Sequence, residues 1–128
     1  MSAAEWLSDP ARGIAKTVRP GQVLMAEIVE KVLDEKGFAM IEAGTGTGKS
    51  FGYLVPAILS GKRIVVSTAK KGLQKQLRDN DLPFLLSKLN TPGASYASIK
   101  GKNNYACQLR LTEFADGDAS FQIGRAHV

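Results

Sequence analysis

Ala43-Gly44-Thr45-Gly46-Thr47-Gly48-Lys49-Ser50 is the stretch that decides the fold of this chain, because it lies between a strand-like run and a helix-like run. The apolar residues 38–41 precede it, and a second apolar run begins at Phe51. Glycines let the main chain approach a ligand closely, and the start of a helix directs free N–H groups and a positive dipole end toward an anion. The pattern therefore predicts a loop that binds the phosphates of a nucleotide.

Each residue type in this loop suits a polyphosphate. Lys49 supplies a mobile cation for the β- and γ-phosphates, and the hydroxyl of Ser50 is a ligand for Mg²⁺. The remaining loop residues are expected to bind the phosphates through main-chain N–H groups: Gly44, Thr45, Gly46, Thr47 and Gly48. A flexible glycine- and threonine-rich linker is the alternative, but it does not explain a Lys-Ser pair at the start of a helix.

The composition fits one globular domain with an excess of basic residues. The chain has 128 residues, a formal net charge of +5 and a pI near 9.5, which is compatible with a nucleic-acid partner. No apolar run reaches the roughly 20 residues of a membrane helix, and no secretion signal is visible at the N-terminus. We therefore expect a cytoplasmic protein with no membrane partner. The single cysteine, Cys107, excludes an internal disulfide.

The last residues of the chain match a sequencing adapter. Residues 123–128 read Ile-Gly-Arg-Ala-His-Val, which is the translation of a widely used short-read library adapter in one reading frame. We hypothesise that the native sequence stops at about Phe121 and that residues 122–128 are an adapter-derived tail. The only histidine, His127, lies in this tail, so no histidine chemistry is assigned.

The hydrophobic pattern predicts alternating helices and strands. Helices are expected over residues 21–36, 48–59, 72–79 and 81–89, with Gly37 ending the first and Pro56 inside the second. Strands are expected over residues 38–41, 62–69 and 95–99. This order indicates an α/β fold, a parallel sheet with flanking helices and right-handed crossovers. Ligands bind beyond the carboxyl ends of such strands, where Gly44–Ser50 and Ser67–Ala69 fall.

Four landmarks in this order resemble the first motor domain of XPD/DinG-type helicases, the iron–sulfur branch of superfamily 2. Arg19-Pro20-Gly21-Gln22 is similar to the Q motif, and Glu42–Ser50, with Ala43 in place of the common first glycine, resembles motif I. Val65–Ala69, followed by Asp81-Leu82-Pro83, resembles motif Ia and its extension. Lys100–Cys107 resembles the segment that introduces the first cluster cysteine, although Lys102 replaces the usual arginine. The DinG/YoaA-like branch matches best, over residues 19–107.

The resemblance implies a fold and an activity. Residues 1–121 would be the truncated N-terminal part of the first motor domain, a partial RecA-like P-loop NTPase domain. The full-length protein would be a monomeric ATP-dependent DNA helicase that unwinds DNA with 5′→3′ polarity, and its partner would be single-stranded or forked DNA. Hydrolysis also requires an acidic metal ligand and an arginine finger, and neither is present here. We therefore expect the 128-residue chain itself to be inactive.

The resemblance also implies roles for residues outside the loop. Arg19 and Gln22 would lie near the adenine, whose N7 and 6-amino group suit the amide of a glutamine. DNA phosphates would be held by Ser67, Thr68 and Lys70. Cys107 would be the first ligand of a [4Fe–4S] cluster, which needs four thiolates.

Each of these roles has a simpler alternative. Gln22 taken alone suits a surface position on a helix, Thr68 suits a turn, and a lone cysteine such as Cys107 suits a small buried site. Two other functions stay open for the whole protein. A P-loop small-molecule kinase would need an arginine-rich lid after the third strand and would not need Gln22. A non-catalytic nucleic-acid-binding module would retain the loop only as a relic.

Overall fold

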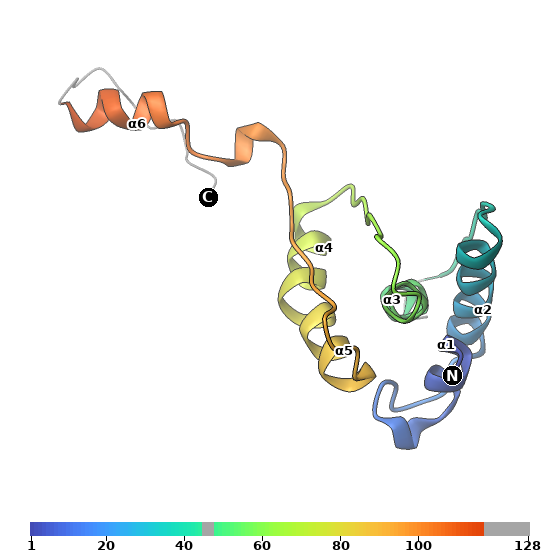
Figure 1. The fold of residues 1–128 in the computed structure, drawn as a ribbon. Coiled ribbons are helices and arrows are strands. Elements are labelled where there is room, and N and C mark those ends of the chain that lie inside the picture. Colours follow the sequence, from blue (N-terminus) through green and yellow to red (C-terminus); the bar gives the residue numbers. More distant parts are fainter. Residues whose placement is uncertain (45–47, 117–128) are drawn as a thin grey trace. The chain divides into compact units, whose positions relative to one another are not determined.

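The computed structural model describes residues 1–44 and 48–116, so loop residues 45–47 and the tail hypothesised for 122–128 lie outside the described part. The chain divides into two compact units, Met1–Ala97 and Ser98–Val128. Figure 1 traces the first unit from blue through green and yellow to orange. Its elements are α1 (Ala3–Ser8), η1 (Pro10–Arg12), α2 (Pro20–Glu35), α3 (Lys49–Leu59), α4 (Lys71–Gln76), η2 (Leu77–Asp81) and α5 (Leu82–Leu89).

Helix α2 confirms the helix predicted over residues 21–36. Pro20 occupies its first turn, where a missing N–H group does no harm, and the helix buries Gln22, Met25 and Ala26. The left-handed residue that ends it is Lys36, with φ 56°, and not the expected Gly37. The N–H groups of both residues donate to the carbonyl of Val32.

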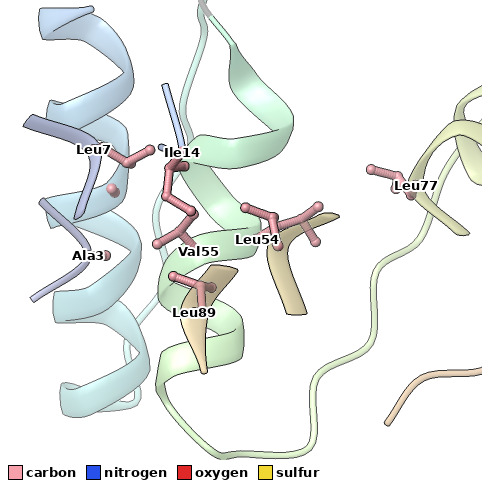
Figure 2. Close-up of a cluster of buried hydrophobic side chains, with 9 residues drawn as sticks. Ala3, Leu7, Ile14, Leu54, Val55, Leu77 and Leu89 are labelled. Atoms are coloured by element: carbon pink, nitrogen blue, oxygen red, sulfur yellow. The ribbon is translucent and has the colours of Figure 1, made fainter. Parts of the chain in front are cut away.

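A cluster of buried apolar side chains joins α1, α2, α3 and α5. Figure 2 shows Leu7, Ile14 and Val55 pointing toward one another. Burial of a large apolar side chain stabilises a fold by about 1.5–3 kcal/mol. Phe51 of α3 stacks on Phe84 of α5, with ring centroids 5.8 Å apart. Helix α3 is therefore held between α2 on one side and α5 on the other. The remaining members of the cluster are Ala3, Ala26, Leu54, Leu77, Leu85 and Leu89.

A single π-helical turn, η2, interrupts the run from α4 to α5. The N–H group of Leu82 donates to the carbonyl of Leu77, five residues earlier, instead of to Arg78. Pro83 has no N–H group, so the helix offers no donor for the carbonyl of Arg78. The hydroxyl of Tyr96 supplies that hydrogen bond at 3.1 Å.

The expected parallel sheet is absent from the described residues, which form helices and no strand. Segments 38–41, 62–69 and 95–99 are irregular and form no ladder of hydrogen bonds. Several of their apolar side chains are almost fully exposed, including Phe38 at 93% and Val65 at 89%. A strand forms only when a neighbouring strand pairs with its N–H and C=O groups in a regular ladder, and the described residues contain no such ladder. The prediction of an α/β, RecA-like sheet was therefore wrong for this structure.

The second unit is short and carries little core. Its described elements are η3 (Lys102–Asn104) and α6 (Gln108–Ala115), and none of its described side chains is buried. The hydroxyl of Tyr105 accepts a hydrogen bond from the N–H group of Lys100 at 2.8 Å, which closes the loop between them. Within the described ranges of the chain, no helix is long and apolar enough to cross a membrane.

Candidate phosphate-binding site

The start of α3 has the geometry of an anion site. Gly48 immediately precedes the helix with φ 72° and ψ 41°, a left-handed conformation that suits glycine. Its carbonyl accepts the N–H group of Gly52 at 3.2 Å, which closes the first helical turn. The first N–H groups of a helix have no acceptor within that helix. At the start of α3 the N-cap residue is Gly48, which has no side chain to accept a hydrogen bond from them. These donors and the helix dipole favour a negative charge at this point.

Two side chains of the first turn can act on a bound polyphosphate. Lys49 is exposed and Ser50 is half-buried. The ammonium group of Lys49 can approach phosphate oxygens, and the hydroxyl of Ser50 is a suitable ligand for Mg²⁺. Both residues lie at the helix start, as the loop pattern predicts. Helix α3 thus presents main-chain donors, a cation and a hydroxyl at one end.

The N-terminus of α2 meets the N-terminus of α3 through a buried glutamine. Gln22 is only 2% exposed, and its Nε2 donates to the carbonyl of Gly48 at 2.9 Å. Its Oε1 is buried and has no hydrogen-bond partner among the described residues. An unpaired buried acceptor costs about 1–3 kcal/mol, so the burial of this oxygen is unfavourable in the free chain.

Arg19 lies beside the same glycine. It stands at the N-cap of α2 and is exposed. Its Nη1 is 3.1 Å from the position that a Cβ atom on Gly48 would occupy. The structure therefore brings Arg19, Gln22 and Gly48 together, although they are up to 29 positions apart in the chain. The expected contact of Arg19 and Gln22 with adenine stays a prediction.

Close packing of α2 on α3 continues one turn further along. A Cβ atom on Gly52 would lie 2.8 Å from Sδ of Met25, and one on Gly48 would lie 2.2 Å from Nε2 of Gln22. Only glycine fits at either position without movement of the neighbour. The sequence analysis did not predict this pairing. Its only signal in the sequence is a spacing: Gln22 and Met25 lie three positions apart, and Gly48 and Gly52 lie four positions apart. Both spacings place two residues on the same face of a helix.

The other residues of the predicted loop are only partly described. Gly44 is exposed and lies in an irregular segment. Thr45, Gly46 and Thr47 lie outside the described residues, so their expected phosphate contacts stay predictions. The described part of the loop is therefore Gly44 and the helical side, from Gly48 onward.

The residues expected to bind DNA lie in the segment that leads into α4. Ser67 and Lys70 are exposed, and Thr68 is half-buried. The hydroxyl of Thr68 donates to the carbonyl of Lys70 at 3.3 Å, which shapes the turn before the helix. Lys70 stands at the N-cap of α4, with Lys71 directly after it. A hydroxyl and two cations are thus available to phosphate groups on this surface.

Cys107 does not form a complete metal site with the residues of this chain. It is exposed and stands at the N-cap of α6. It is the only cysteine in the sequence, whereas a [4Fe–4S] cluster is held by four thiolates. Among the residues that the structure describes, no group of three or more His, Cys, Asp or Glu side chains could hold a metal ion.

The curated proteins that are similar to this chain include the following three helicases. It is 46% identical over 95 residues to the ATP-dependent DNA helicase YoaA of Haemophilus influenzae, covering 74% of this chain and 15% of that protein. It is 40% identical over 107 residues to the ATP-dependent DNA helicase YoaA of Escherichia coli, covering 82% and 17%. It is 40% identical over 118 residues to the ATP-dependent helicase DinG of Mycobacterium tuberculosis, covering 87% and 18%.

The chain thus spans 15–18% of the length of these relatives. No family model matches the chain, and no solved structure matches it either.

Proposed function

This chain is a DinG/YoaA-like helicase sequence, and we propose that it supplies the site that holds the triphosphate of ATP in an ATP-dependent DNA helicase. The observation that carries this proposal is the meeting of two helix starts. The buried Gln22 of α2 contacts Gly48, directly before Lys49 and Ser50 of α3. The side chains of Gln22, Lys49 and Ser50 and the left-handed glycine thus lie at one end of α3, where an anion is favoured.

In this proposal the phosphates of ATP lie at the start of α3. Main-chain N–H groups and Lys49 bind the β- and γ-phosphates, and Ser50 contributes a hydroxyl to Mg²⁺. Loop residues 44–48 add further N–H groups. Arg19 and Gln22 lie toward the adenine, whose N7 and 6-amino group suit the amide of a glutamine.

Hydrolysis needs groups that this chain does not provide. An oriented water, an acidic residue on Mg²⁺ and an arginine that neutralises the developing charge are all required. The chain binds and orients the triphosphate but does not complete the catalytic set. We therefore expect weak nucleotide binding and no turnover from the 128-residue chain alone.

DNA is the second partner in this proposal. The names of the relatives indicate DNA as the substrate of those proteins. Ser67, Thr68 and Lys70 would hold phosphates of the DNA strand before α4, without reading bases. Movement with 5′→3′ polarity, a monomeric state and a cytoplasmic location are further parts of the proposal.

Cys107 enters the proposal only as one ligand. Its exposed position at the start of α6 leaves its sulfur accessible. It would be the first thiolate of a [4Fe–4S] cluster whose other three ligands come from outside this chain. When bound, the cluster would hold distant segments of chain together, and no step of ATP hydrolysis is assigned to it.

The proposal is tested on the full gene product that contains this chain. We expect ATP hydrolysis stimulated by single-stranded DNA, unwinding of forked DNA, and loss of both in Lys49→Ala. Phosphorylation of a small acceptor would instead favour a P-loop kinase. DNA binding unaffected by ATP and by Lys49→Ala would favour a non-catalytic binding module. Lys49-dependent hydrolysis by the 128-residue chain alone would contradict the expectation that it lacks part of the catalytic set.

A further inference from the structure

Gln22 makes its one observed hydrogen bond to the main chain of the phosphate loop. The side chain is 2% exposed, and its Nε2 donates to the Gly48 carbonyl at 2.9 Å. Gly48 has no Cβ atom, and one placed there would lie 2.2 Å from that nitrogen. The contact therefore depends on the glycine, on its left-handed backbone and on the burial of the amide.

The Gly48 carbonyl is a sensitive point of the site. Its peptide plane carries this carbonyl on one side and the N–H group of Lys49 on the other. A hydrogen bond that fixes the direction of the carbonyl therefore also fixes the direction of that N–H group. In the site proposed above, this N–H group is one of the donors at the start of α3.

We propose that Gln22 is a positioning residue for the phosphates, and that it acts through the Gly48 carbonyl with no need for a base. This inference rests on the proposed function, because it assumes that a polyphosphate binds at the start of α3. It differs from adenine recognition in a measurable way. A residue that contacts only adenine has no effect on a ligand without a base, whereas a residue that orients the Lys49 N–H group affects every polyphosphate.

The probe that separates the two roles is inorganic tripolyphosphate with Mg²⁺. Binding to the folded ¹⁵N-labelled chain is followed through the amide signals of residues 48–51. The main variant is Gln22→Met, which keeps the length of the side chain and removes its polar atoms. The Gly48 carbonyl still accepts the N–H group of Gly52 in this variant, and an unpartnered buried oxygen is removed. We therefore expect a melting temperature close to that of the wild type.

Two further variants control for charge. Lys49→Ala identifies binding at the helix start, as opposed to general attraction of a polyanion to a chain of net charge +5. Lys31→Ala removes a cation from an exposed position on α2 and is expected to leave the affinity nearly unchanged. Gln22→Glu has oxygen atoms only and would repel the Gly48 carbonyl, so its affinity is expected to fall below that of Gln22→Met.

We expect Gln22→Met to weaken tripolyphosphate binding about fivefold, the effect of one neutral hydrogen bond. Unchanged affinity for tripolyphosphate, together with weakened binding of ATP, would overturn the positioning role and leave the proposed function intact. Absence of any Lys49-dependent binding of tripolyphosphate or ATP by the wild type would overturn the proposed function itself. A measurement without variants adds to this test: hydrogen exchange of the Gln22 side-chain amide in the free chain should be slow, and exchange as fast as in a solvated amide would also contradict the inference.

Discussion

The hydroxyl of Tyr96 donates a hydrogen bond to the main-chain carbonyl of Arg78 at 3.1 Å. This carbonyl has no donor within the helix, because Leu82 bonds to Leu77 and Pro83 has no N–H group. A side chain 18 positions away in the chain therefore completes a helical turn that proline leaves open. The contact ties the segment after α5 back to η2.

Tyr96→Phe removes only this hydroxyl. We expect the free energy of unfolding to fall by about 0.5–1 kcal/mol, as measured by urea denaturation, because the ring is partly exposed and water can replace the donor. Pro83→Ala returns an N–H group that the Arg78 carbonyl can accept. The effect of Tyr96→Phe should then shrink in a Pro83→Ala background, and a strictly additive double mutant would contradict this account.

Gly48→Ala tests the close approach of α2 and α3. A Cβ atom at φ 72° is strained by about 1–2 kcal/mol, and here it also meets the amide of Gln22 at 2.2 Å. Gly61→Ala is the matched control, since Gly61 has φ 65° but nothing within 4 Å of its Cβ position. We expect Gly48→Ala to lower stability by about 1 kcal/mol more than Gly61→Ala. If thermal unfolding shows the same loss of stability in both variants, the close approach of Gln22 to Gly48 does not contribute to the effect.

Lys36 offers a substitution that should stabilise the chain. This exposed residue ends α2 in a left-handed conformation, with φ 56°, which glycine adopts without strain. Lys36→Gly is expected to raise the free energy of unfolding by up to about 1 kcal/mol. Asn90 has φ 47° at the end of α5, and asparagine tolerates this region better. Asn90→Gly should therefore give a smaller gain, and the reverse order in chemical denaturation would contradict the argument.

Asp81 gives stability a dependence on pH. Partial burial raises the pKa of its carboxyl group above 3.8, and the hydrogen bond from Gln76 opposes this only in part. The folded state then binds the proton more tightly than the unfolded state, so stability falls as the pH rises from about 3.8 through the folded pKa.

Asp81→Asn should remove this dependence. The amide still accepts the hydrogen bond from Gln76, and we expect stability at pH 7 to rise by less than about 1 kcal/mol, because water screens the carboxylate. Asp34→Asn removes the same charge from an exposed position of α2 and controls for the change in net charge. If both variants show the same pH profile in denaturation, burial of Asp81 is not the cause.

The helices could be predicted from the sequence because their signals are local. Apolar spacing over 21–36 predicted α2, observed as Pro20–Glu35, and the Lys-Ser pair after Gly48 predicted the start of α3. Motif order was enough to suggest that Gln22 and Gly48 belong to one site. The hydrogen bond between them was not predictable, because it joins residues 26 positions apart through a main-chain carbonyl.

The strands were predicted wrongly because their signal is not local. The apolar runs at 62–69 and 95–99 indicate segments suited to burial between neighbours, but a strand needs a partner for its hydrogen bonds. In the described part of the chain these segments pair with no neighbouring strand, and Ile99 remains 85% exposed. The π-helical turn η2 was also not predicted. Pro83 indicates that the helix lacks one N–H group, but it does not indicate that Tyr96 donates to the carbonyl of Arg78 instead.

Titration of ATP and Mg²⁺ into the folded ¹⁵N-labelled chain tests the central claim most directly. If the triphosphate is held at the start of α3, the amide signals of residues 48–51 will shift and saturate, and these shifts will be absent in Lys49→Ala. Amide signals that stay unchanged at saturating ATP, or that shift equally in Lys49→Ala, would contradict the account.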